Sequence, residues 1–157
     1  MKQRRKIILA VIVIVGISIL GINYFMNLTT TMDQAVLNKL DETEVTLLIN
    51  RIPVNTEIPS KDVNITDQNQ ISNVFKQMSS LKLKKTLNID KQDITSEYNV
   101  LIYSKDSRVL FSVAFLNEKY LYVYDKNNKE TTQNYSITSD FDYNSFTDML
   151  EQLLESH

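Results

Sequence analysis

The chain of 157 residues contains no cysteine, two glycines, two prolines and a single histidine. Without cysteine it can form no disulfide, carry no lipid-modified cysteine and use no thiol nucleophile. The chain has no Gly-rich phosphate loop and no G-x-S-x-G motif. The histidine is the last residue, His157, and a chain terminus rarely holds a general base in place. Because the common enzyme signatures are absent, we expect no catalytic residues, no cofactor and no enzymatic activity.

One long apolar run is present, at the start of the chain, which reads MKQRRKIILAVIVIVGISILGINYFMN. The run covers about 20 residues, enough to cross ~30 Å of hydrocarbon as a helix. A cleavable signal peptide would have a shorter apolar core and small residues before the cut, and the exit GINYFMNLTTTM lacks such a pair. A buried core helix would need a much larger soluble body around it. We therefore predict an uncleaved signal-anchor at residues 7–26.

Charge predicts the orientation of this span in the cell membrane. Lys2, Arg4, Arg5 and Lys6 precede it, whereas the first basic residue after it is Lys39, and cationic flanks stay cytoplasmic. Residues 1–6 are thus expected inside the cell and the carboxyl-terminal part outside. Removing the four cytoplasmic charges from 17 basic residues leaves 13 against 19 acidic ones, a formal charge of −6. That balance argues against a nucleic-acid partner.

The remaining sequence predicts a stalk or linker helix over residues 27–43 and one domain over residues 44–157. DQNQISNVFKQMSS is typical of an amphipathic helix, with Asp67 as N-cap and an apolar stripe of Ile71, Val74, Phe75 and Met78. NSFTDMLEQLLES predicts a closing helix. The segment RIPVNTEIP, with both prolines, is typical of a turn or an edge. Strands are predicted at residues 44–50, 61–66, 81–85, 98–104, 108–116, 119–125 and 131–137.

The expected fold class is α+β, with an N-terminal transmembrane helix followed by an antiparallel sheet of about five to seven strands and two helices packed on one side. Short separators between the later strands favour a meander. The outline resembles small tethered extracytoplasmic domains of unknown function in Gram-positive bacteria. The segments that carry the resemblance are VNIT running into DQNQISNVFKQMSSL, the hairpin VLFSVAFLNEKYLYVYD, and the ending YSITSDFDYNSFTDMLEQLLE. The resemblance implies location and fold, and no activity.

Two groups of side chains are candidates for binding. KYLYVYD places Tyr120, Tyr122 and Tyr124 on one strand face, where they could meet a protein partner or stack on a glycan. Tyrosines also favour strands and form cross-strand pairs without any binding role. LKLKK offers Lys82, Lys84 and Lys85 to anionic headgroups or wall polymers near the membrane, although lysines on an edge strand also prevent aggregation.

A possible calcium loop occurs in DFDYNSFTDMLE, where Asp140, Asp142, Asn144, Asp148 and Glu151 occupy positions 1, 3, 5, 9 and 12 of an EF-hand-type pattern. Position 6 is Ser145 where the loop needs glycine, and the apolar stripe of the closing helix requires continuous helix from Phe146. We therefore expect no metal site, with Asp148 and Glu151 on the solvent side of the helix.

These observations favour a non-enzymatic binding or accessory module of the bacterial cell envelope, with another envelope protein as its partner. The alternatives are an extracytoplasmic ligand or ion sensor, and an envelope enzyme of unrecognised type that uses carboxylates such as Asp140 and Asp142.

Overall fold

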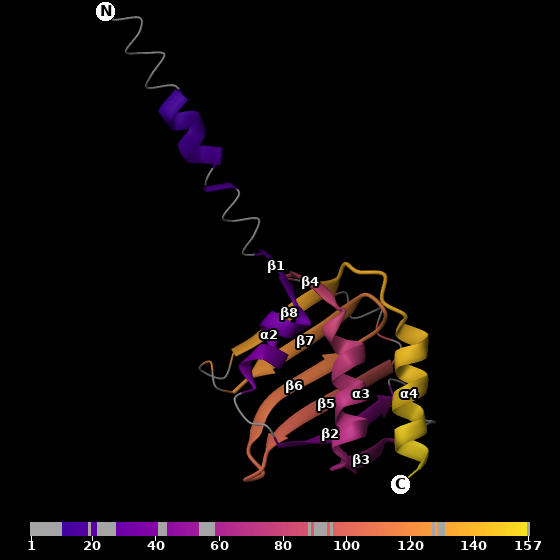
Figure 1. Cartoon of the computed structure of the whole chain (residues 1–157). Helices are drawn as coiled ribbons and strands as arrows, with labels where there is room; N and C mark the ends of the chain where they lie inside the picture. Colours follow the sequence, from indigo (N-terminus) through magenta and orange to yellow (C-terminus); the bar gives the residue numbers. More distant parts are fainter. Residues whose placement is uncertain are drawn as a thin grey trace, which may run out of the picture.

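The computed structural model describes residues 11–18, 20–21, 28–40, 44–53, 59–87, 89, 94, 96–126, 128 and 131–156. The larger part of these residues forms one antiparallel sheet with helices packed against it (Figure 1). The α+β class predicted from the sequence is therefore confirmed. The sheet has eight strands, more than the expected five to seven. They are β1 (Thr29–Thr31), β2 (Val45–Pro53), β3 (Lys61–Ile65), β4 (Lys82–Lys85), β5 (Ser96–Ser104), β6 (Val109–Phe115), β7 (Tyr120–Asp125) and β8 (Thr131–Ile137).

The strand order is β1-β4-β8-β7-β6-β5-β2-β3, and every neighbouring pair is antiparallel. Strands β5 to β8 are neighbours in sequence and in space, which confirms the predicted meander. Strand β2 is longer than expected, because Arg51, Ile52 and Pro53 continue its pairing with β5 instead of forming a turn. Pro53 is tolerated at the strand end, where a missing N–H donor disrupts the ladder least.

Two amphipathic helices, α3 (Gln68–Ser79) and α4 (Tyr143–Glu155), cover one face of the sheet (Figure 1). Asp67 caps α3 as predicted, accepting hydrogen bonds from the backbone N–H groups of Asn69 and Gln70. The inward stripe of α3 is Ile71, Val74 and Met78, whereas Phe75 is only partly buried. The stripe of α4 is Phe146, Leu150 and Leu154.

The stalk or linker helix was expected over residues 27–43, but residues 28–40, the described part of this range, contribute structure to the domain itself. They supply β1, the short helix α2 (Met32–Ala35) and the 3-10 turn η1 (Leu37–Lys39). Met32 and Val36 are fully buried in the same core as the sheet and the other helices. Among the described residues the sheet therefore starts at β1, before the expected boundary at residue 44, and Met32 and Val36 fill part of the core.

The core lies between the helices and the sheet face that they cover. It is built from alternate strand residues and from the helix stripes, and Phe115 of β6 packs on Phe146 of α4 with ring centroids 4.7 Å apart. Phe141, just before α4, lies 5.3 Å from Phe146. These rings join the start of α4 to the middle of the sheet.

The predicted membrane anchor is described only in part. Residues 11–18 and 20–21 are helical and their apolar side chains are exposed, for example Ile14 at 64% and Leu20 at 70%. Within the stretches that the structure describes, no helix combines the length and the apolar character needed to span a membrane. The predicted tail at residues 1–6, and residues 7–10, 19 and 22–26 of the predicted span, lie outside the described residues.

Candidate functional site

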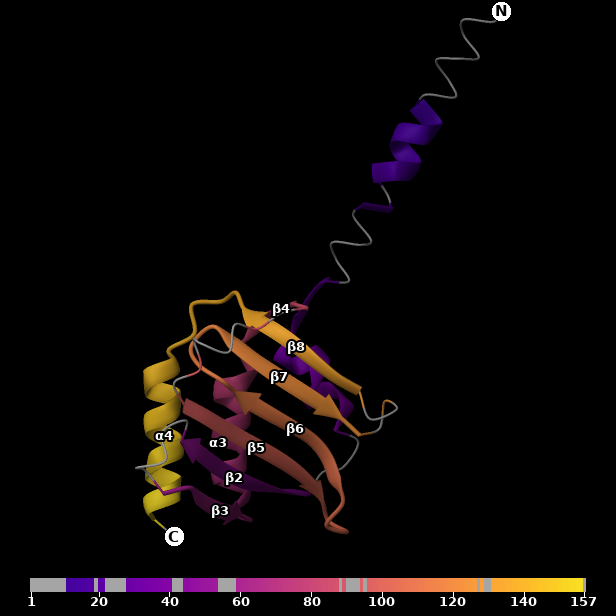
Figure 2. The ribbon, with the colours of Figure 1, turned by 180° about the vertical axis from the view of Figure 1, so that it is seen from behind.

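The sheet face opposite the helices carries the three tyrosines of β7. Viewed from behind, α3 lies beyond the strands and no described helix covers this face (Figure 2). In β7 the inward side chains are Leu121 and Val123, which are buried in the core. Because side chains alternate along a strand, Tyr120, Tyr122 and Tyr124 project from the uncovered face, where each is half-buried. We call this surface the open face.

Tyr122 reaches across its neighbouring strand β6 to β5. Its register partner on β6 is Ala114, and its hydroxyl donates a hydrogen bond of 3.0 Å to the Glu97 carboxylate on β5, one strand further. Ala114 is fully buried although it faces away from the core, since a ring that reaches β5 must pass over it. Burial and the Glu97 carboxylate raise the pKa of Tyr122 to about 12. The ring is thus held in place and remains neutral at physiological pH.

Apolar and amide side chains continue the open face across β6, β5 and β2. The register aligns Tyr124 with Ser112, Ser112 with Leu101, and Leu101 with Leu48. The Ser112 hydroxyl donates to the Asn99 side-chain oxygen at 2.8 Å. Aromatic rings, aliphatic side chains and short hydrogen-bonding groups on one surface match the composition of protein interfaces.

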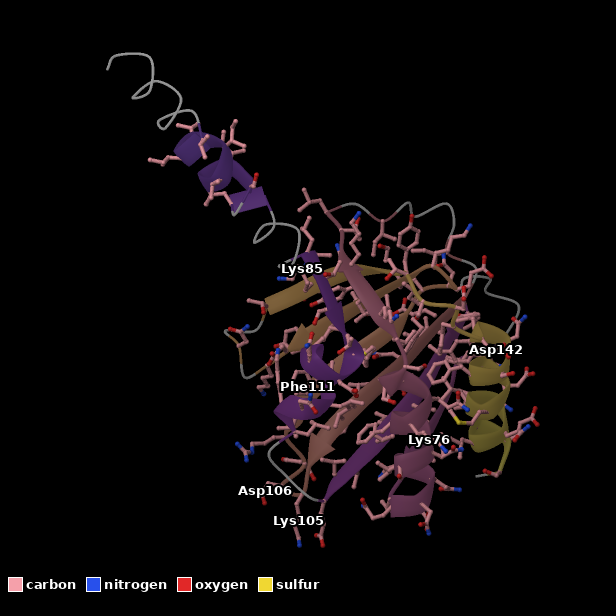
Figure 3. All side chains as sticks on the ribbon, turned by 45° about the horizontal axis from the view of Figure 1, so that its top comes forward. Lys76, Lys85, Lys105, Asp106, Phe111 and Asp142 are labelled. Carbon is pink, nitrogen blue, oxygen red and sulfur yellow. The ribbon has the colours of Figure 1, made fainter. Side chains whose placement is uncertain are left out.

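The three lysines of LKLKK do not share one face. Leu83, between them, is buried in the core, so Lys82 and Lys84 project from the open face and Lys85 from the helix side. All three side chains are exposed. Strand β4 lies between β1 and β8, so the interpretation of these lysines as protection of a sheet edge is wrong. Lys85 lies at the corner of the domain where β1 begins (Figure 3).

A polar cavity of about 150 Å³ lies on the helix side, next to α2 and η1. Inside it the Lys39 ammonium forms an ion pair of 3.2 Å with Asp125, whose side chain is 9% exposed. The other Asp125 oxygen accepts a hydrogen bond of 3.1 Å from the Asn128 N–H. The Lys39 ammonium nitrogen also lies 6.0 Å from the centre of the Phe111 ring. The remaining lining residues include Lys85, Thr131, Gln133 and Tyr135.

The cavity brings together residues that lie far apart in sequence, and of these only Lys85 was a candidate site residue in the sequence analysis. One signal was available: in KYLYVYD the alternation that places Leu121 and Val123 inward also places Asp125 inward, and a charge at an inward position needs a partner. Its partner, Lys39, lies in the segment expected to be a stalk. Burial and the Asp125 carboxylate raise the pKa of the Tyr135 hydroxyl, which lines the same cavity.

The acidic residues of the possible calcium loop do not converge on one point, and one of them, Asp142, caps α4. The Asp142 carboxylate caps α4, accepting from the Ser145 N–H at 3.0 Å and the Ser145 hydroxyl at 2.6 Å, and these bonds lower the pKa of Asp142. Asp140 and Asp148 are exposed. Residues 143–155 form one continuous helix, as the apolar stripe requires. Among the residues that the structure describes, no group of three or more His, Cys, Asp or Glu side chains could hold a metal ion.

Glu151 was expected on the solvent side of α4, but in the structure it contacts the sheet. Its carboxylate forms an ion pair of 2.7 Å with Arg51 on β2 and accepts a hydrogen bond of 2.8 Å from the Tyr98 hydroxyl on β5. Burial and Glu151 raise the pKa of Tyr98 above its ordinary value. These contacts of Glu151 with Arg51 and Tyr98 attach α4 to strands β2 and β5.

No family model, curated protein or solved structure matches the chain. The geometry of the chain itself therefore identifies its two candidate sites, the open face with its tyrosines and the polar cavity around Asp125.

Proposed function

We propose that this chain is a non-enzymatic binding module, held at the outer face of a bacterial cell membrane by residues 7–26, that uses the open face to bind another envelope protein. The observation that carries the proposal is the position of the β7 tyrosines on the one sheet face that the described helices leave uncovered. Tyrosine contributes a large rigid contact area at low cost in conformational entropy, which makes it common in binding surfaces.

The anchor is supported by the N-terminal sequence and by the exposed apolar helix. The side chains of Val11, Ile12, Val13 and Ile14 are each more than half exposed, and such a contiguous apolar surface needs lipid or protein around it. The basic residues before it favour the orientation with the domain outside. An extracytoplasmic position also agrees with the resemblance to tethered Gram-positive domains.

A protein partner fits the open face better than a charged ligand does. The central strands β5, β6 and β7 present tyrosine, leucine, serine and asparagine there, and the Glu97 carboxylate accepts a hydrogen bond from Tyr122. The partner surface should therefore be apolar at its centre with hydrogen-bonding groups around it.

Isolation of the tagged full-length protein from membranes tests this proposal. The variant Tyr120→Ser with Tyr124→Ser removes two rings from the open face and keeps Tyr122, whose ring covers Ala114. We expect this variant to melt like the unaltered protein but to recover at least tenfold less of a co-purifying protein.

The matched control is Lys76→Ser with Gln77→Ser on the exposed side of α3. This variant should retain the partner. Equal recovery with both variants would exclude the open face as the binding surface.

The polar cavity favours a second candidate function, an extracytoplasmic sensor of a small polar ligand. Its lining residues include the buried Asp125 together with Lys39, Lys85 and Tyr135. A ligand bound there would contact both η1 and β8. A screen of small carboxylates and amines by thermal shift should give a rise in melting temperature that is lost in Gln133→Leu if this candidate is correct.

A further inference from the structure

The pairing of β1 with β4 brings three lysines next to the predicted membrane anchor. Strand β1 starts at Thr29, three residues after Met26, where the predicted span ends. Thr29 is opposite Lys84, and the two strands are antiparallel. Since β1 leads away from the anchor, β4 runs back toward it, and Lys85, Thr86 and Leu87 lie beyond the level of Thr29.

Chain length limits how far this corner can lie from the membrane. Three residues reach at most about 10 Å even when fully extended. The β4 ladder continues to Thr86, whose N–H donates to the Asn134 carbonyl at 3.0 Å. At roughly 3.3 Å per strand residue, the chain from Lys84 to Leu87 covers the same distance in the direction of the anchor. Leu87 can therefore reach the lipid surface.

The charge of this corner is opposite to that of the domain. Residues 81–87 contain three lysines and no acidic residue, whereas the part after the predicted span carries 13 basic against 19 acidic residues. Lys82, Lys84 and Lys85 are exposed. Cations within a Debye length of about 8 Å from an anionic surface are attracted to it, and the acidic remainder of the domain is repelled.

Leu87 adds an apolar contact to the lysines. Its side chain is 93% exposed, the largest value among the exposed large hydrophobic residues of the described chain. An apolar side chain beside cationic ones is the combination by which protein segments bind the membrane interface.

We propose that Lys82, Lys84, Lys85 and Leu87 form a docking surface for anionic phospholipid headgroups. The inference rests on the proposed anchor at residues 7–26. The anchor and the docking surface together give the domain two points of attachment. The corner of the domain at the start of β1 and the end of β4 then lies against the lipid, and the open face is accessible to a partner from the side.

The test uses the full-length protein in lipid nanodiscs and exploits the absence of cysteine, which makes a single introduced cysteine a unique labelling site. A fluorophore on Leu87→Cys reports contact with lipid through quenching by spin-labelled phospholipid. A fluorophore on Asp106→Cys is the matched control, because Asp106 is exposed and lies at the opposite end of the domain from Lys85 (Figure 3). We expect strong quenching at position 87 in discs that contain phosphatidylglycerol, weaker quenching in phosphatidylcholine alone, and none at position 106.

Lysine-to-glutamine variants test whether the contact at position 87 depends on the positive charge of the docking surface or only on the nearby anchor. Lys82→Gln, Lys84→Gln and Lys85→Gln together should reduce the ratio of docked to undocked protein about a hundredfold, at about fivefold per lysine. The control triple Lys61→Gln, Lys76→Gln and Lys105→Gln, which removes the same charge elsewhere, should change it little. Equal quenching at positions 87 and 106, or no response to the first triple, would overturn the docking surface and leave the anchor intact. Failure of the full chain to co-purify with nanodiscs would overturn both.

Discussion

Tyr122 differs from Tyr120 and Tyr124 although the three occupy equivalent positions in the KYLYVYD pattern. The difference comes from the neighbouring strand, where Ala114 is small enough for the Tyr122 ring to pass over it and reach Glu97. Sequence alternation predicts that the three tyrosines share a face. It does not predict the register between β6 and β7 that, within the described part of the chain, gives Tyr122 a carboxylate partner.

The raised pKa of Tyr122 predicts a pH dependence of stability. The folded-state pKa is about 12 and the ordinary value is 10.0, so the unfolded chain loses this proton first as pH rises. The stabilisation is therefore complete below about pH 10 and is lost as pH rises toward 12. Tyr122→Phe should cost about 1 kcal/mol at neutral pH, and this difference should shrink in that window. Urea unfolding of both proteins at several pH values measures it, and a constant difference up to pH 12 contradicts the Glu97 contact.

Glu151 should be important for stability, because its carboxylate binds two groups of the sheet at once. In Glu151→Ala the Arg51 guanidinium loses its ion pair, and the Arg51 Nε atom already has no hydrogen-bond partner within the described part of the chain. We expect a loss of about 2 kcal/mol in the free energy of unfolding. Glu155→Ala, at an exposed position of the same helix, should change it by less than about 0.5 kcal/mol. Equal effects in denaturant titrations would show that the Arg51–Glu151 pair contributes nothing.

Among the helices and strands, the features that depend on residues close together in sequence were predicted well. The N-cap at Asp67, the stripes of α3 and α4, and the bounds of β8 follow from residues within a few positions of one another. The predictions that failed depend on distant pairing. Arg51 to Pro53 extend β2 because β5 provides hydrogen-bonding partners.

The place of β1 and α2 in the core changes where the domain can be cut. A fragment of residues 28–157 retains Met32 and Val36, whereas a fragment of residues 44–157 leaves their core positions empty. Burial of these two side chains contributes about 3–6 kcal/mol, a large part of the stability of a typical domain. We expect the longer fragment to melt cooperatively and the shorter one to melt far lower or not at all. Calorimetry on both fragments checks this, and matching transitions would place α2 outside the core.

For the whole molecule, the polar cavity and the position of the docking surface depend on contacts between residues that are distant in sequence. The cavity joins Lys39, Lys85 and Asp125, which belong to three elements. The docking surface depends on the pairing of Thr29 with Lys84 across more than fifty intervening residues. The tyrosines of KYLYVYD and the lysines of LKLKK each lie on one strand, and both groups were visible in the sequence. Alternation along β7 separates its side chains into two faces, and the positions of the helices determine which of these faces is buried.

The most direct test of the central claim, that the open face binds an envelope protein outside the cell, is crosslinking from a single cysteine in intact protoplasts. A membrane-impermeant photoreactive maleimide would be attached at Tyr124→Cys on the open face and, as a control, at Asp148→Cys, an exposed position on α4. We predict labelling at both positions and a discrete crosslinked protein only from position 124. Absence of labelling at both would place the domain inside the cell. Labelling without a crosslink specific to position 124 would show that the open face does not bind a partner.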